Sequence, residues 1–155
     1  MRNKKISILF SLMVLLIKLA SAQILNPVKW SFTAKKTAPK TYELHMIANL
    51  DTNWHIYAQD FEGPAATSFS FAANPLVKLD GIVKESGKLK KEYDPVLRSM
   101  LRYYNRQVDF IQKINMRTKA TTAVQGKVMF VTCNDITRQC LLQKDISFSI
   151  KIDGK

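Results

Sequence analysis

Two cysteines, Cys133 and Cys140, are the residues of this sequence best suited to chemistry, because they are its only cysteines. Six residues separate them, and most of that segment is polar. A turn of this length can bring two Cα atoms within the roughly 4.4–6.8 Å that a disulfide requires. Thiol–disulfide exchange, a structural disulfide and metal binding are therefore the kinds of chemistry open to the pair.

The first 22 residues indicate where the two thiols are found. A basic start is followed by a mostly apolar stretch from Ile6 to Leu19 and by the small residues Ala20-Ser21-Ala22, which match a cleavage site. The apolar stretch is shorter than the ~20 residues of a membrane-spanning helix, which argues against an uncleaved anchor. We expect residues 1–22 to be a secretory signal peptide and residues 23–155 to form one domain without a transmembrane segment. Export would place both cysteines where disulfides form and persist.

The chain is basic, with a net charge of +12, of which +8 remains once the four positive charges of residues 1–22 are removed. Acidic residues are interleaved with the lysines and arginines, and no nucleic-acid-binding motif accompanies them. The pattern favours a solvated surface, with attraction to an acidic partner or a membrane surface as the alternative. We expect no nucleic-acid partner.

The elements that must position the cysteines are strands, because apolar residues alternate with polar ones along much of the chain. We expect residues 54–58 to return as a hairpin partner of 42–50. Residues 88–102 are expected to form a long loop with one short strand at 100–103, and Tyr104-Asn105-Arg106 to turn the chain. Gly126 is expected to interrupt its strand as a bulge. The other predicted strands are 27–37, 67–72, 76–84, 108–116, 124–131 and 146–152.

Short strands separated by Gly, Pro, Asn and Asp predict an all-β fold, an antiparallel β-sandwich with a barrel as the main competitor. Two sheets that bury their inner faces need bulky apolar side chains between them. We assign the aromatic residues on the apolar faces to that core and give them no function: Trp30, Tyr42, Phe69, Phe71, Phe110, Phe130 and Phe148.

Several segments resemble the N-terminal domain of the thiol:disulfide interchange protein DsbD, in its Bacteroidetes-type form. The most specific is VTCND at 131–135, followed by a second cysteine at the start of the last strand. Weaker matches are VKWSF at 28–32, NWHIY at 53–57, KEYDP at 91–95, VDFIQ at 108–112 and SFSIK at 147–151. The chain departs from relatives in the longer spacing of the cysteines and in Leu141-Leu142, where relatives often carry Leu-Pro-Pro.

The resemblance implies an immunoglobulin-like sandwich in the periplasm and a component of a thiol-disulfide oxidoreductase system. Its cysteine pair would pass electrons to or from thioredoxin-fold proteins, with a membrane electron-conduit protein as a further partner. The family's full-length members continue into a membrane domain and a thioredoxin-like domain, whereas this sequence ends at Lys155. No cofactor or metal is expected.

The resemblance also implies residues around the pair. Tyr93, Asp94 and Leu97 match a cap loop over the family's disulfide, with an ordinary surface turn as the alternative. His55 and Tyr57 match tyrosine positions that line the family's site, with a lone exposed histidine as the alternative. His55 could stabilise a thiolate, because histidine titrates near neutrality. Two further residues follow the first cysteine, Asn134 and Asp135, and the charge of Asp135 could instead disfavour a thiolate.

Two other functions compete with exchange. A Cys2His2 metal site would combine the cysteines with His45 and His55, and four methionines could serve copper(I), but the spacing of these residues does not favour either site. An exported binding module would use the disulfide only to staple the last hairpin. Closing that eight-residue loop would contribute about 2.5 kcal/mol to stability in the chain-entropy model.

Overall fold

The computed structural model describes residues 25–96 and 98–154, and their secondary structure is entirely β. The predicted signal peptide at 1–22 and the cap residue Leu97 therefore lie outside the described residues. The strands are β1 (Val28–Ala38), β2 (Thr41–Leu50), β3 (Trp54–Tyr57), β4 (Ser68–Phe71), β5 (Val77–Asp94), β6 (Ser99–Met116), β7 (Thr122–Phe130), β8 (Thr132–Asn134) and β9 (Lys144–Ile152).

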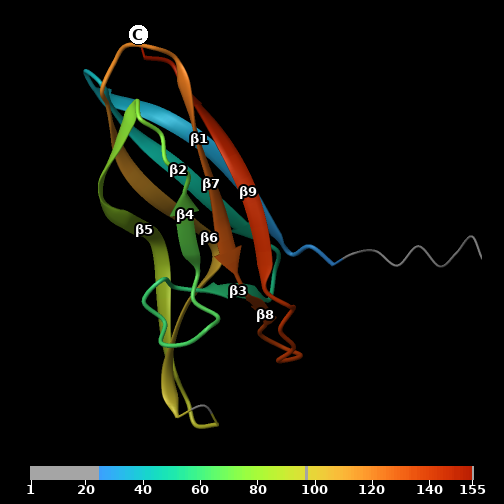
Figure 1. Cartoon of the computed structure of the whole chain (residues 1–155). Helices are drawn as coiled ribbons and strands as arrows, with labels where there is room; N and C mark the ends of the chain where they lie inside the picture. The colour runs from blue at the N-terminus through green and yellow to red at the C-terminus, as the bar shows by residue number, and fades with distance from the viewer. Residues whose placement is uncertain (1–24, 97, 155) are drawn as a thin grey trace, which may run out of the picture.

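The strands form two antiparallel sheets, shown in Figure 1. In the larger sheet β6 is central: β2 and then β3 pair along one of its edges, and β5 pairs along the other. The outer strands of this sheet are β1, which pairs with β2, and β8, which pairs with β3. The smaller sheet has the order β4-β7-β9. This arrangement confirms the predicted antiparallel sandwich.

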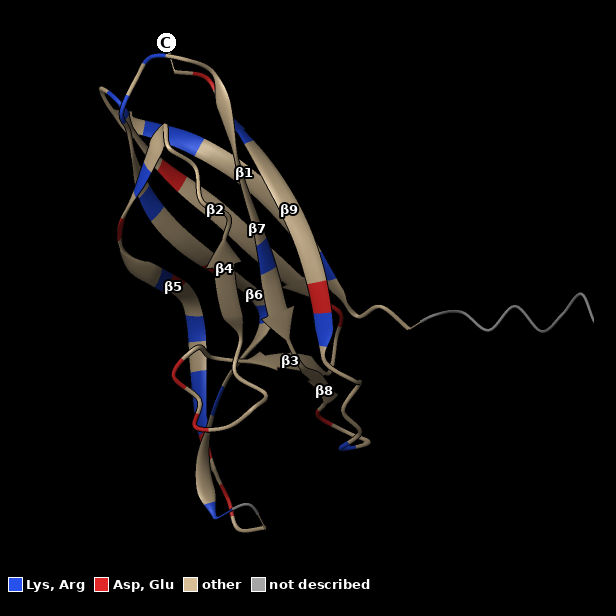
Figure 2. Ribbon diagram, viewed as in Figure 1, with Lys and Arg blue, Asp and Glu red and all other residues tan. Residues whose placement is uncertain are grey.

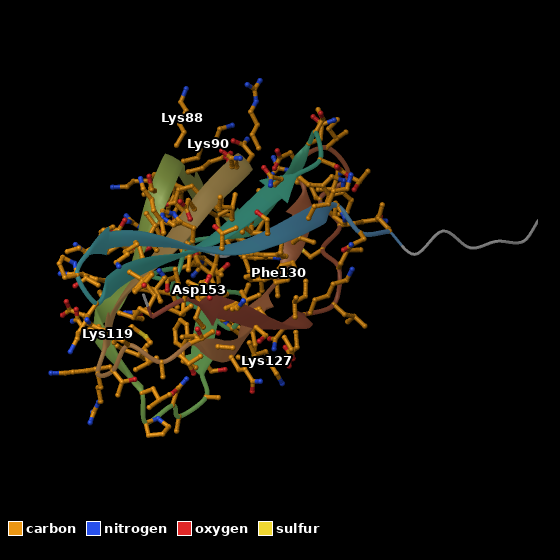
Figure 3. The ribbon with its side chains drawn as sticks, turned by 90° about the horizontal axis from the view of Figure 1, so that it is seen from above. Lys88, Lys90, Lys119, Lys127, Phe130 and Asp153 are labelled. Atoms are coloured by element: carbon orange, nitrogen blue, oxygen red, sulfur yellow. A yellow bond between two sulfur atoms is a disulfide. The ribbon has the colours of Figure 1, made fainter. Side chains whose placement is uncertain are left out.

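The core lies between the two sheets, as the alternation along the strands predicts. Residues 42, 44, 46 and 48 of β2 are buried, while the residues between them lie on the opposite face. Trp30 of the larger sheet contacts Phe69 and Phe130 of the smaller one, with ring centroids 6.1 and 5.4 Å apart. Figure 3 shows Phe130 in the layer between the sheets. The aromatic residues assigned to the core are all buried in it or packed against it.

The predicted hairpin between 42–50 and 54–58 is wrong. β3 does not fold back on β2, but continues in the same direction along the same edge of β6, so that Asn49 pairs with Gln107 and His55 with Asn105. Residues 51–53 between the two strands form a short loop that does not reverse the direction of the chain. Asn53 lies there at a φ of 66°, a conformation that asparagine tolerates better than most residues.

The predicted loop at 88–102 and the predicted turn at 104–106 are also wrong, because β5 and β6 form one long hairpin in which Asp94 pairs with Ser99 at the end of the ladder. The register shifts between Gly87 and Leu89, opposite residues 105–107, so the turn-forming residues make a β-bulge within β6. Arg106 has a φ of 70° at this bulge. β5 contains nearly all of the predicted strand at 76–84 but continues to Asp94, and most residues of this second half are polar and exposed, which is why no apolar face marked them as a strand.

Gly126 is not a bulge, because β7 keeps continuous register with β9 on both sides of it. It leaves room for a neighbouring ring: a Cβ at this position would lie 2.4 Å from Cζ of Phe148 and 2.5 Å from the carbonyl oxygen of Ser70. The glycine is therefore needed for close packing across the smaller sheet.

Charged residues are spread over both sheets, with acidic and basic residues close together (Figure 2). Surface ion pairs join Asp80 to Lys113, Asp145 to Lys127, and Asp60 to Arg102. Exposed pairs of this kind contribute little to stability, typically below about 1 kcal/mol. Their distribution agrees with a solvated surface.

Candidate functional site

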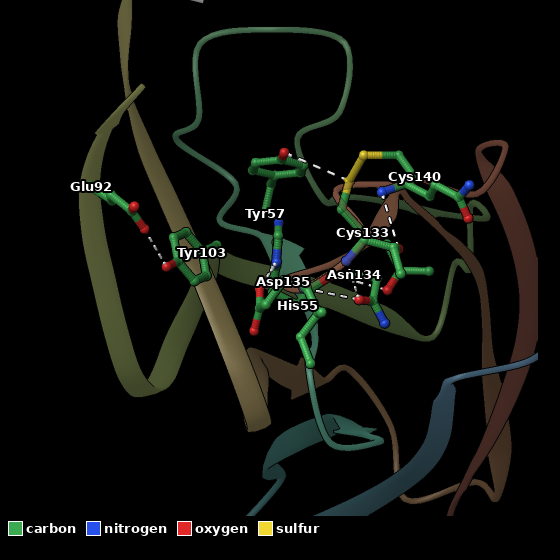
Figure 4. Close-up of polar contacts among 12 residues, drawn as sticks. His55, Tyr57, Glu92, Tyr103, Cys133, Asn134, Asp135 and Cys140 are labelled. Carbon is green, nitrogen blue, oxygen red and sulfur yellow. Dashed lines mark hydrogen bonds and ion pairs between the residues drawn. A yellow bond between two sulfur atoms is a disulfide. The ribbon is translucent and has the colours of Figure 1, made fainter. Parts of the chain in front are cut away.

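The cysteine pair lies at one end of the sandwich, where β8 pairs with β3. Cys133 and Cys140 form a disulfide, as predicted. Cys133 belongs to β8 and pairs directly with His55, whereas Cys140 follows the loop that starts at Asn134 (Figure 4). The site is therefore built from a strand pair of the larger sheet and from the loop that leads towards β9.

Asn134 holds the loop between the cysteines in shape. Its side-chain oxygen accepts hydrogen bonds from the backbone N–H groups of Ile136 and Thr137, both at 2.9 Å. Its own backbone N–H donates to the carbonyl oxygen of Gln139 at 2.9 Å. Asparagine side chains commonly form such turns with the backbone that follows them. Asn134 thus supports the position of Cys140 through the backbone of the loop.

The two cysteines differ in accessibility. Cys133 is only 3% exposed and packs with Tyr57, Leu101 and Tyr103 in a small apolar cluster separate from the main core. Cys140 is exposed. A thiolate approaching from solvent therefore meets Cys140, and Cys133 is the sulfur that would leave when the disulfide opens.

Tyr57 covers Cys133. Its hydroxyl oxygen lies 3.7 Å from Sγ of Cys133, and since a disulfide sulfur carries no hydrogen, the hydroxyl is the donor. The ring stacks on Phe61 with centroids 4.4 Å apart. Burial, followed by the charge of Asp94, raises the pKa of Tyr57 above its ordinary value. The phenol is therefore protonated at neutral pH and available as a hydrogen-bond donor to sulfur.

His55 is buried at this site, so the alternative of a lone exposed histidine is wrong. Its Nδ1 lies 2.5 Å from Oδ1 of Asp135. Burial lowers the pKa of His55 below 6.5, and the hydrogen bond to Asp135 only partly opposes this effect. At neutral pH the imidazole is neutral, and Nδ1–H donates to the carboxylate because the carboxylate can only accept.

Tyr103 and Glu92 also belong to the site, and sequence reasoning missed both. The Tyr103 hydroxyl donates to Oε2 of Glu92 at 2.8 Å, and its ring lies 4.6 Å from that of His55. Burial and the Glu92 hydrogen bond raise the pKa of Tyr103 to about 12. A hairpin between β5 and β6 brings these two residues together. The sequence signal that could have predicted this hairpin is the turn at Tyr93-Asp94-Pro95, which lies between two strand-like segments.

The expected cap residues Tyr93 and Asp94 lie at the tip of the β5–β6 hairpin. They line a pocket of about 400 Å³ that Arg138 of the cysteine loop also lines, so the hairpin tip adjoins the site. Tyr93 is 58% exposed, and Oδ1 of Asp94 accepts a hydrogen bond from the backbone of Val96. Their role as a cap over the disulfide remains a prediction.

The Cys2His2 alternative is not assembled in the structure. His45 lies on β2, where its Nδ1 is 2.7 Å from Oδ2 of Asp109. Across residues 25–96 and 98–154 there is no group of three or more His, Cys, Asp or Glu side chains placed to bind a metal ion.

The described part of the chain contains no helix long and apolar enough to cross a membrane.

The fold and the site together define an immunoglobulin-like sandwich with a cysteine pair at one end. Among solved structures, this fold is similar to that of the N-terminal domain of DsbD from Neisseria meningitidis in the reduced form, with a TM-score of 0.55 and 11% identity over 84% of this chain and 91% of that one. It is also similar to the N-terminal periplasmic domain of ScsB from Proteus mirabilis, with a TM-score of 0.56 and 13% identity over 86% of this chain and 49% of that one.

These likenesses confirm, at the level of the fold, the resemblance to DsbD N-terminal domains. No protein-family model and no curated protein sequence matches the chain. The Bacteroidetes-type form of the domain stays a prediction.

Proposed function

We propose that this chain is a periplasmic module for thiol–disulfide exchange that relays electrons through Cys133 and Cys140 to or from thioredoxin-fold proteins. One observation carries the proposal: a disulfide with one exposed and one buried cysteine lies in a loop at the end of a DsbD-like sandwich. Exchange needs a sulfur that a partner can reach and a second sulfur that can leave and return. The pair meets both conditions.

In the reducing direction, a partner thiolate attacks Sγ of Cys140 and the bond between the two cysteines breaks. Cys133 leaves with the electron pair and takes up a proton. The partner's second thiolate then attacks its own mixed-disulfide sulfur, which forms the partner's disulfide and releases Cys140 as a thiolate. Two electrons have passed from the partner to this chain, and the reverse sequence returns them.

The cellular setting is part of the proposal. The signal peptide predicted at 1–22 supports export, and the ScsB domain of similar fold is described as periplasmic. A thioredoxin-fold partner and a separate membrane electron-conduit protein are the partners that we propose. Tyr93 and Asp94 at the hairpin tip, together with Leu97, are proposed to control access to Cys140.

Trapping tests the relay. The Cys133→Ala variant keeps the exposed Cys140 and should form a mixed disulfide with an oxidised thioredoxin-like protein, visible as a larger species on a non-reducing gel. The Cys140→Ala variant is the matched control, because it keeps only the buried cysteine and should trap much less. The reduction potential of the wild type should lie above the roughly −300 mV below which structural disulfides are found.

A disulfide that stays oxidised against reduced thioredoxin-like proteins, with no complex trapped by either variant, would contradict the relay. The chain would then be an exported binding module with a structural disulfide.

A further inference from the structure

His55 is the histidine that faces the buried cysteine. It pairs with Cys133 across β3 and β8, and directly paired residues point to the same face of a sheet with Cβ atoms about 4.5–5.5 Å apart. Tyr57 lies two residues along β3, on the same face, with its hydroxyl at Sγ of Cys133. Figure 4 shows the three side chains grouped beside the cysteine loop.

Among the described residues, one nitrogen of His55 has no hydrogen-bond partner. Nδ1 is bonded to Asp135, whereas Nε2 is buried and makes no hydrogen bond to any of the described residues. A buried polar atom without a partner costs free energy and calls for an explanation. The disulfide form of Cys133 carries no hydrogen, but the reduced form carries an S–H group directly opposite this histidine. Reduction therefore adds a candidate donor for Nε2 on the residue that pairs with His55.

We propose that His55 accepts the proton of the Cys133 thiol when Cys133 closes the disulfide, and that Asp135 is the positioning residue that orients the imidazole. The inference rests on the proposed exchange function. It adds Nε2 of His55 and the carboxylate of Asp135 to an exchange site otherwise defined by two sulfurs.

The step balances as follows. In the reduced chain, the Cys140 thiolate attacks the disulfide of the oxidised partner, forming a mixed disulfide and releasing one partner thiolate. Cys133 then transfers its proton to Nε2 of His55, and its sulfur attacks Sγ of Cys140. The mixed disulfide breaks, the partner leaves with the electron pair as a second thiolate, and the proton on His55 passes to solvent or to that thiolate.

The neighbouring groups favour His55 over other bases. The phenols of Tyr57 and Tyr103 have raised pKa values and hold their protons. The carboxylate of Asp135 is engaged with Nδ1. Cys133 is 3% exposed, which limits transfer of its proton to bulk water.

The charges around His55 set its state before the reaction. Asp135 and Glu92 raise its pKa, whereas burial and Arg138 lower it, and burial is the largest effect. His55 is therefore neutral at pH 7 and able to accept a proton, which Asp135 then stabilises on the imidazolium.

The test uses the reduced full chain and one equivalent of a small aromatic disulfide, dithiobis(nitrobenzoate), as the probe. Attack by Cys140 releases one coloured thiolate, and closure by Cys133 releases a second, so absorbance separates the two steps. In His55→Gln we expect the second release to slow on the order of 10²-fold, the usual contribution of a general base, with the first within about threefold. Asp135→Asn should slow the second release less.

The matched control is His45→Gln, because His45 has the same Nδ1 contact with an aspartate and pairs with Ile111 instead of a cysteine. Its Nε2 also makes no hydrogen bond among the described residues, although Oε2 of Glu43 lies 3.9 Å away. This variant should leave both releases unchanged. The pH profile distinguishes a general base from a residue with a purely structural role. In the wild type, the rate of the second release should fall on acidification below the pKa of His55. His55→Gln should lose this inflection.

A second release in His55→Gln within about twofold of the wild type, or an equal loss in His45→Gln, would overturn the proposal. If circular dichroism shows that His55→Gln does not fold, the pH profile of the second release is measured on Asp135→Asn instead. An unchanged rate and inflection in that variant would overturn the proposal. The probe needs no protein partner, so the two proposals can fail separately. A slower second release in His55→Gln without trapping of a partner would contradict only the relay. Trapping of a partner without that slower release would contradict only this inference.

Discussion

Single side chains at this site divide the work between the two cysteines. Cys140 is exposed, while Cys133 is enclosed by Tyr57, Leu101 and Tyr103 and paired with His55. The hydroxyl of Tyr57 on β3 reaches the buried sulfur, and His55 shares the same face of that strand. The chemistry of the buried sulfur therefore depends on two residues that are close in sequence and on the carboxylate of Asp135.

Replacing Tyr57 by Phe should lower the reduction potential. The hydroxyl donates to sulfur, and such a bond strengthens when the sulfur becomes a thiol or thiolate, so it favours the reduced form. A loss of about 1 kcal/mol corresponds to a potential about 20 mV more negative. Equilibration with a dithiol buffer of known potential measures the shift.

Tyr103→Phe is the control for this change, because its hydroxyl donates to Glu92 and not to sulfur. An equal shift in both variants would mean that the Tyr57 hydroxyl has no specific effect on the disulfide.

His55 should make stability depend on pH. Its pKa in the folded chain lies below 6.5, so the unfolded chain binds more protons below that pH, and the free energy of unfolding falls as the pH drops from 6.5 through the folded pKa. Urea unfolding between about pH 7 and pH 5 should show a steeper decline for the wild type than for His55→Gln. Parallel declines would argue that protonation of His55 costs nothing in the folded chain.

At the scale of elements, the loop between the cysteines and the β5–β6 hairpin shape the site. The loop depends on Asn134, whose side chain accepts two backbone N–H groups. The hairpin brings Glu92, Leu101 and Tyr103 to the buried cysteine. No described residue of the cysteine loop, or of the hairpin between residues 90 and 103, belongs to the main core cluster. These parts of the two elements therefore lie outside the sandwich core, whereas the rest of β6 is part of it.

Asn134→Ala should destabilise the chain by about 1 kcal/mol, because two backbone donors lose their acceptor at once. The urea midpoint at unchanged slope measures this loss. Thr137→Ala is the control, since its hydroxyl makes only a 3.4 Å contact with the backbone of Gln139 and should change the midpoint little. Similar losses in both variants would place the effect in the loop as a whole.

Sequence reasoning succeeded where a strand has one buried face and failed where it does not. The alternation at 42–50 predicts β2 because every second residue faces the core. β5 is polar on both faces for much of its length, so its own sequence does not show that it is a strand. Its structure depends on its pairing with β6, which local alternation cannot predict. The same reason hid Tyr103 and Glu92, whereas the cysteines and their neighbours in the chain could be recognised locally.

For the whole molecule, the separation of the two apolar clusters decides whether the disulfide can open without unfolding. The main core between the sheets contains neither cysteine, and Cys133 belongs to the small cluster with Tyr57, Leu101 and Tyr103. Opening the bond therefore leaves the contacts between the sheets intact. A staple that held the main core together would behave differently.

We therefore predict that the reduced chain stays folded. Opening an eight-residue loop costs about 2.5 kcal/mol in the chain-entropy model, less than the roughly 5–15 kcal/mol of a typical domain. Urea unfolding with and without a reducing agent should show a lower midpoint for the reduced chain, by the amount that this free energy divided by the slope m gives, and the same β-sheet circular dichroism before unfolding. The Cys133→Ala/Cys140→Ala variant should show no effect of the reducing agent. A reduced chain that is unfolded without urea would mean that the bond is a structural requirement, and a relay could not operate through it because each cycle would destroy the surface on which the partner docks.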